Sequence, residues 1–257
     1  MCEVIDAKVE FKNFFILLTQ NSWFNKIANG RELEKIVSTC NKNENDNWQY
    51  NLIKFEFKNI NIDRHTRPLI VNKLVKSGDG TASAFLSVSC NCDSINKTGK
   101  IEDPIKTLST KIVLQFEFIN EEDPYEVKIL QSSWHLDKHD ETKKTESSHP
   151  LYHYEFGGSE IVKNSEFDFG DFFLIDSPRL MHPPLDLILA IDFIIKNYYK
   201  EEDHSNLTGQ GLYKRYIKNA QTRVWRPYAI SFASNFYEFD KNVGINTAFA
   251  RNILHCG

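Results

Sequence analysis

The feature that most constrains the fold is a long strand-like stretch in the middle of the chain, from about residue 48 to 176. Apolar and polar residues alternate there, most cleanly at Ile112, Leu114, Phe116 and Phe118. A period of two is typical of a strand with one buried face. No helical period separates the strands, so antiparallel hairpins are favoured over parallel βαβ units. Strands are predicted near residues 53–57, 68–76, 83–91, 110–119, 125–137, 150–156 and 171–176.

Helical patterns flank this stretch on both sides. Phe11, Phe14, Phe15 and Leu18 have the spacing of an amphipathic helix. The run from 185 to 199 is apolar nearly all round, which predicts a buried central helix that Pro183 and Pro184 introduce, with Asp186 in its first turn. The polar run 41–47 is predicted to be a loop. Further helices are expected at 31–40, 207–220, 227–238 and 247–255.

Together these patterns predict an α+β fold, in which N-terminal and C-terminal helices pack on a mostly antiparallel central sheet. The chain shows no internal repeat and no linker, so residues 1–257 are predicted to form a single domain. A hydrophobic fraction of 41% and an aromatic fraction of 13% are typical of a packed globular protein.

The net charge and the cysteines indicate which binding partners and which redox environment to expect. A net charge of -4 and a pI near 6.1 disfavour wholesale attraction to nucleic acid or to an anionic membrane. The first residues do not resemble a secretory signal, and no apolar run is long enough to span a bilayer, so we expect a cytoplasmic protein without a membrane partner. The five scattered cysteines suit reduced thiols, and the close pair Cys90 and Cys92 is weak evidence for a metal site.

The most informative segment for chemistry is a predicted β-hairpin between residues 133 and 158, which is rich in histidine and carboxylate. Alternation sorts its side chains onto two faces. One face carries the aromatic and aliphatic residues Trp134, Leu136, Tyr152, Tyr154 and Phe156, and the other carries His135, Asp137, His139, His149, His153 and Glu155.

A symmetrical closure of the hairpin loop predicts the strand register. It places His135 opposite His153, Trp134 opposite Tyr154, and His139 opposite His149. Cross-strand partners have Cβ atoms about 4.5 to 5.5 Å apart, near enough for two imidazoles to share one ion. A slip by two residues would keep every side chain on its face, so the faces are better determined than the pairing.

Imidazole and carboxylate groups together are typical ligands of a divalent metal, with zinc and manganese as the candidates. The predicted ligands are His135, His153 and either Asp137 or Glu155. His139 and His149 would be outer groups of this site, part of a second site, or ordinary loop histidines. The alternative interpretation is that an exposed hairpin face carries polar side chains in any case, so the histidine and glutamate residues would be solvated or hydrogen-bonded and would bind no ligand.

Two further groups of residues are candidates for binding an anion. Arg179 and His182 lie where the last strand joins the buried helix, where Arg179 could bind a phosphate or carboxylate and His182 could act as ligand or general acid-base. The alternative is that Arg179 pairs with Asp176 or Asp186 and that His182 caps the helix.

A basic helix supplies the second group, Lys214, Arg215, Lys218 and Arg223, which are candidates for contacting a nucleic acid or phosphate. The alternative is an amphipathic surface helix, with Leu212, Tyr216 and Ala220 toward the core and the charges in water.

Two classes of function remain. The chain has no nucleotide-binding loop and no nucleophile motif, so we expect no nucleotide cofactor. The first hypothesis is a metal-assisted hydrolase of a phosphodiester, a nucleotide or another small molecule, in which Glu155 or Asp137 accepts a proton and Arg179 and His182 reach the same cleft. The second is a non-catalytic component that binds protein or nucleic acid, for example in a toxin or phage-defence system.

Overall fold

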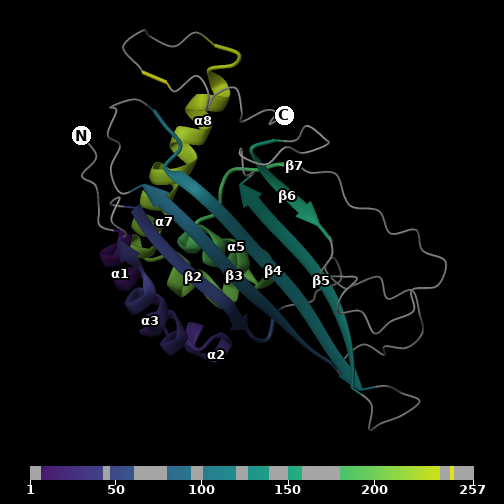
Figure 1. The fold of residues 1–257 in the computed structure, drawn as a ribbon. Coiled ribbons are helices and arrows are strands. Elements are labelled where there is room, and N and C mark those ends of the chain that lie inside the picture. Colours follow the sequence, from purple (N-terminus) through teal and green to yellow (C-terminus); the bar gives the residue numbers. More distant parts are fainter. Residues whose placement is uncertain are drawn as a thin grey trace, which may run out of the picture.

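The structure is a computed structural model, and it describes residues 7–42, 47–60, 80–93, 101–119, 127–138, 150–157, 180–237 and 244–245. It confirms the predicted α+β class, because an antiparallel sheet is packed by helices from both ends of the chain (Figure 1).

The sheet is formed by strands that pair antiparallel in the order of the sequence. Each strand therefore lies beside its neighbours in the chain, as expected for successive strands without helical crossovers. The predicted strands near 83–91, 110–119, 125–137 and 150–156 are confirmed, whereas those at 68–76 and 171–176 lie outside the described residues. The strands are β1 (Asn41–Lys42), β2 (Asn47–Phe57), β3 (Gly80–Asp93), β4 (Ile105–Ile119), β5 (Val127–Lys138), β6 (Tyr152–Phe156) and β7 (Leu180–Met181).

The helices precede and follow the sheet in the sequence, as predicted. They are α1 (Ala7–Thr19), α2 (Phe24–Ile27), α3 (Gly30–Thr39), α5 (Leu187–Tyr198), α6 (Glu201–Thr208), α7 (Gly211–Ala220), the π-helical turn η1 (Gln221–Trp225) and α8 (Arg226–Ala233). None of the described helices is long and apolar enough to cross a membrane. The helix expected at 247–255 lies outside the described residues.

Several boundaries differ from the prediction; for example, the helix expected at 207–220 is divided between α6 and α7. The run 41–47 was expected to be a loop, but its first two residues form β1 and its last begins β2, because Asn41 and Lys42 pair with Gln49 and Trp48. The central helix α5 begins at Leu187, later than predicted. Asp186 is its N-cap, and its side chain accepts a hydrogen bond from the backbone N–H of Leu189 at 3.0 Å.

The helices lie on one side of the sheet, which we call the helix face (Figure 1). Phe11 of α1 meets the ring of Tyr50 edge to face, with ring centroids 4.9 Å apart. Thr110 of β4 donates a hydrogen bond to the backbone oxygen of Leu185 at 2.9 Å, just before α5. Alternate residues of β3 on this face are buried, namely Ala82, Ala84, Leu86, Val88, Cys90 and Cys92. The core therefore lies between the helix face and the helices.

The other side of the sheet, which we call the polar face, carries the residues that alternate with this core. Ser87 and Ser89 of β3 lie on it, followed by Lys111 and Ser109 of β4, and all four are exposed or half-buried. The alternation explains this division, because successive side chains of a strand point to opposite faces.

One residue of β2 departs from the predicted alternation. Ile53, Phe55 and Phe57 alternate with charged residues in the sequence, which predicts that all three share one buried face, but Ile53 is 71% exposed while both phenylalanines are fully buried. The pairing of β2 with β3 is irregular between Leu52 and Phe55, and Lys54 has a φ of 50°. The irregularity changes the face on which the residues before it project.

Candidate metal centre

The predicted polar residues of the hairpin do project from one face of β5 and β6, but their pairing differs from the prediction. His135 lies opposite Glu155, and Asp137 lies opposite His153. The predicted pairing of His135 with His153 is wrong by a shift of two residues. The predicted pair of His139 and His149 lies outside the described residues.

A physical reason explains why the pattern could not separate these registers. A two-residue shift leaves every side chain on its own face, so the alternation of aromatic and polar residues is compatible with both registers. Trp134 lies opposite Phe156, with ring centroids 4.4 Å apart, and it also stacks on Tyr154 at 5.2 Å.

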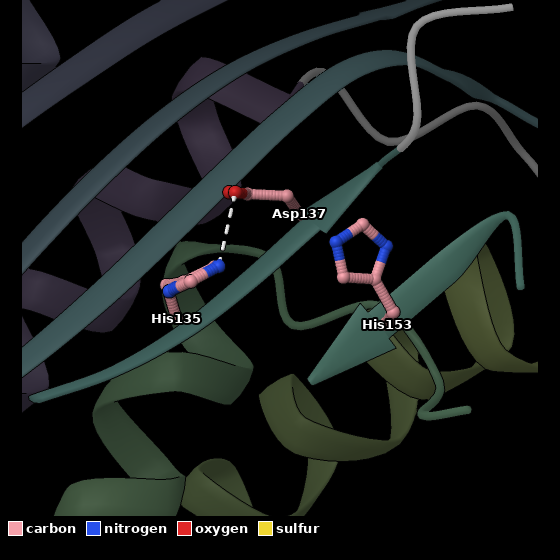
Figure 2. A group of neighbouring side chains, drawn as sticks. All are labelled: His135, Asp137 and His153. Carbon is pink, nitrogen blue, oxygen red and sulfur yellow. Dashed lines mark ion pairs between the residues drawn. The ribbon is translucent and has the colours of Figure 1, made fainter. Parts of the chain in front are cut away.

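The observed register gathers His135, Asp137 and His153 into one group. Figure 2 shows the side chain of His135 and the carboxylate of Asp137 facing each other beside β5, joined by an ion pair, with the ring of His153 on the neighbouring strand β6. One ligand atom from each of the three lies within 4.8 Å of the others. His135 Nε2 is 3.7 Å from Asp137 Oδ2, and the two imidazole rings have centroids 6.5 Å apart and are nearly perpendicular. Such a group could hold a metal ion, and because of this possible role we call His135, Asp137 and His153 the metal-binding group.

Glu155 is the fourth polar residue of the cluster. Its Oε2 lies 3.3 Å from His135 Nε2, and the residue is only 6% exposed. His135 Nε2 therefore lies close to carboxylate oxygens from both strands, one from Asp137 beside it and one from Glu155 across from it. A neutral imidazole nitrogen can bind a cation there, and the carboxylates favour that cation electrostatically.

The second carboxylate oxygen of Asp137 gives independent support for a ligand. Asp137 Oδ1 is buried and has no hydrogen-bond partner among the described residues. Leaving a buried charged oxygen without a partner is costly, so groups of this kind normally bind hydrogen-bond donors, water or metal. The donor set of two imidazoles and one carboxylate suits a divalent ion with open coordination positions.

His182 lies apart from this cluster, although it was expected to reach the same cleft. Its ring contacts Tyr154, with centroids 5.4 Å apart, and Tyr154 also contacts Phe193 of α5. His182 is therefore on the helix face, across β6 from the metal-binding group. Burial lowers the pKa of His182, and its Nδ1 lies 2.6 Å from the backbone oxygen of Pro183. The alternative that His182 caps the helix is also wrong, because Asp186 is the N-cap.

Arg179, the predicted partner of His182 in binding an anion, lies outside the described residues.

Three of the predicted phosphate-contacting residues are on α7. Lys214, Arg215 and Lys218 are exposed, and the opposite side of this helix packs in the helix layer, where Tyr213 contacts Phe14 with ring centroids 5.6 Å apart. They lie on the side of the sheet away from the metal-binding group. Leu212 was predicted to face the core, but it is 48% exposed, and the neighbouring Tyr213 is buried in its place.

Arg223 belongs to a different environment, although it was grouped with these basic residues. It lies in η1 and forms ion pairs with Glu10 of α1 and with Asp186, whose Oδ2 is 2.5 Å from Arg223 Nη2. Burial works against the charged guanidinium, but Asp186 and Glu10 outweigh it and raise the pKa of Arg223 above its ordinary value. Arg223 thus joins three elements of the helix layer and is not part of a basic surface.

Two neighbours of the metal-binding group were not predicted. Lys111 lies opposite His135, and Ser109 lies opposite Asp137, both on β4. Alternation alone predicts their face but not their partner on the next strand, because pairing between strands depends on register.

Comparison of the chain with protein-family models, with curated proteins and with solved structures found no match, so the arrangement of these side chains is the basis for assigning a function.

Proposed function

We propose that the protein is a metal-assisted hydrolase whose metal centre is formed by His135, Asp137 and His153. The observation that carries this proposal is the proximity of the three ligand atoms, all within 4.8 Å of one another, together with the buried Oδ1 of Asp137, for which the described part of the chain supplies no hydrogen-bond partner. Zinc and manganese are the candidate ions, since both accept imidazole and carboxylate ligands.

The metal would supply an activated water, because a bound divalent ion lowers the pKa of a water ligand toward neutrality. Glu155 is well placed to accept the proton of that water. It lies beside the three ligands, its Oε2 is 3.3 Å from His135 Nε2, and it is as buried as His153. Asp137 supplies the carboxylate ligand in this assignment, so the two acidic residues have different roles: Asp137 binds the metal and Glu155 moves a proton.

The metal content of protein purified without a histidine tag tests the binding step. We expect about one zinc or manganese ion per chain, and we expect added metal to raise the melting temperature. A ligand at a hundredfold excess over its dissociation constant stabilises the folded state by about 2.7 kcal/mol. His135→Ala and His153→Ala should each abolish this stabilisation.

The matched control is His182→Ala, which removes a histidine from the other face of β6 and should leave metal binding unchanged. A protein that neither contains nor binds metal would contradict the proposal and leave the non-catalytic binding component as the remaining hypothesis.

Glu155→Gln separates chemistry from binding. The variant keeps the three ligands but loses the proton acceptor, and general-base catalysis is typically worth about a hundred- to ten-thousandfold in rate. We therefore expect normal metal affinity and a rate of hydrolysis lowered by about that factor, measured with a panel of chromogenic phosphate and carboxylate esters. Wild-type rates in Glu155→Gln would rule out this role for Glu155.

A further inference from the structure

A row of side chains continues from the metal-binding group across the polar face. Lys111 lies opposite His135, and Ser87 of β3 lies opposite Lys111. Side chains that face each other across antiparallel strands have Cβ atoms about 4.5 to 5.5 Å apart. Lys111 is therefore on the strand next to the metal-binding group, and its side chain projects from the same face of the sheet.

The neighbouring row carries hydroxyl groups. Ser109 lies opposite Asp137, and Ser89 lies opposite Ser109. Ser89 and Ser109 are exposed, while Ser87 and Lys111 are half-buried. We call Ser87, Ser89, Ser109 and Lys111 the hydroxyl shelf. Its side chains are small apart from that of Lys111, and the two exposed serines are reached by solvent.

Lys111 is the one lysine or arginine in these two rows of described residues. A lysine ammonium is a compact positive charge that binds the oxygens of phosphate or carboxylate groups, and serine hydroxyls can donate hydrogen bonds to the same oxygens. The shelf has no aromatic side chain on which a base could stack, so it suits the anionic group of a substrate and not a nucleobase.

We propose that the hydroxyl shelf is the substrate subsite of the metal centre, and that Lys111 and Ser109 bind the anionic oxygens of a phosphate ester. This inference rests on the proposed hydrolytic function, because it names the substrate class of the same site. A phosphate group can contact the metal with one oxygen while its other oxygens remain available to the ammonium and the hydroxyl. The exposed lysines and arginine of α7 have no part in this subsite, because they lie on the other side of the sheet.

Binding of inorganic phosphate tests the inference without a known substrate. Phosphate affinity is measured by ³¹P NMR titration, and metal affinity of each variant is measured separately by calorimetry. We expect Lys111→Met to weaken phosphate binding about tenfold or more, the range for losing a hydrogen bond to a charged group. Lys111→Arg should keep most of the affinity, and Ser109→Ala should weaken it severalfold.

Lys106→Met is the matched control on the same strand. Lys106 is exposed and pairs with Asp93 at 2.8 Å, so its loss should change neither phosphate nor metal affinity. Acetate serves as the second ligand, and we expect it to bind more weakly than phosphate. Binding of acetate as tight as that of phosphate would replace the phosphate ester by a carboxylate and overturn the assignment.

The outcomes also separate this inference from the proposed function. Phosphate affinity that is absent, or unchanged in a folded Lys111→Met variant, overturns the subsite even if the protein binds metal. Phosphate binding that depends on Lys111 in a protein that binds no metal would support the anion subsite and reject the hydrolase.

Discussion

The ion-pair cluster around Arg223 predicts a large loss of stability when the arginine is removed. Arg223 bridges Glu10 of α1 and Asp186 at the start of α5, and these carboxylate residues are only 1% and 3% exposed. Arg223→Met keeps an apolar stem of similar length but leaves two buried carboxylates without their cation. The variant therefore isolates the loss of charge from the loss of packing.

The magnitude follows from measurements on other buried ion pairs. Removing one partner of such a pair typically costs about 3 to 5 kcal/mol, because the remaining charge is left uncompensated. For a protein of this size, each kcal/mol lowers the melting temperature by about 2 to 4 °C. We therefore expect Arg223→Met to lower the melting temperature by about 6 to 20 °C.

Urea denaturation at pH 7, followed by circular dichroism, measures the free energy of unfolding directly. Arg215→Met is the control, since Arg215 is exposed on α7 and should change stability by no more than about 0.5 kcal/mol. The double variant Glu10→Gln with Arg223→Met should recover part of the loss, because it removes one of the two uncompensated charges. A loss below about 1 kcal/mol in Arg223→Met would refute the reasoning.

Two further predictions concern the helix layer and the junction before α5. Phe14 is fully buried and contacts the rings of Tyr213 and Tyr216. Phe14→Ala should therefore lower the free energy of unfolding, measured by urea denaturation, by about 3 to 5 kcal/mol. Ile16 is 39% exposed, so Ile16→Ala should lower it by less. Burial lowers the pKa of His182 below its ordinary 6.5, so the unfolded chain binds this proton more readily. The stability that His182 contributes is then present above pH 6.5 and lost as pH falls, with a slope of at most about 1.4 kcal/mol per pH unit. His182→Gln should flatten the dependence of unfolding free energy on pH between 7 and 5, and an identical slope in both proteins would contradict this.

The sequence alone predicted most of the helices and strands that the structure describes, and most of the faces on which their side chains lie. Periods of two and of 3.6 residues are local properties of a segment, and they reflect which side of a strand or helix is buried. The aromatic and the polar sides of the hairpin were therefore assigned correctly for Trp134, Tyr154, His135 and Glu155. Ile53 was an exception, because an irregularity in β2 interrupts the alternation.

Which residues contact each other across long distances in the sequence was decided only by the tertiary structure. Register places Glu155 opposite His135 and Lys111 on its other side, and a shift of two residues would have satisfied the same alternation. Arg223 shows the same limit, since its neighbours on the helix suggested a basic surface while its carboxylate partner Glu10 is 213 residues away in the chain. Contacts of this kind depend on how whole elements pack against each other, and a pattern within one segment carries no information about the segment that will lie beside it.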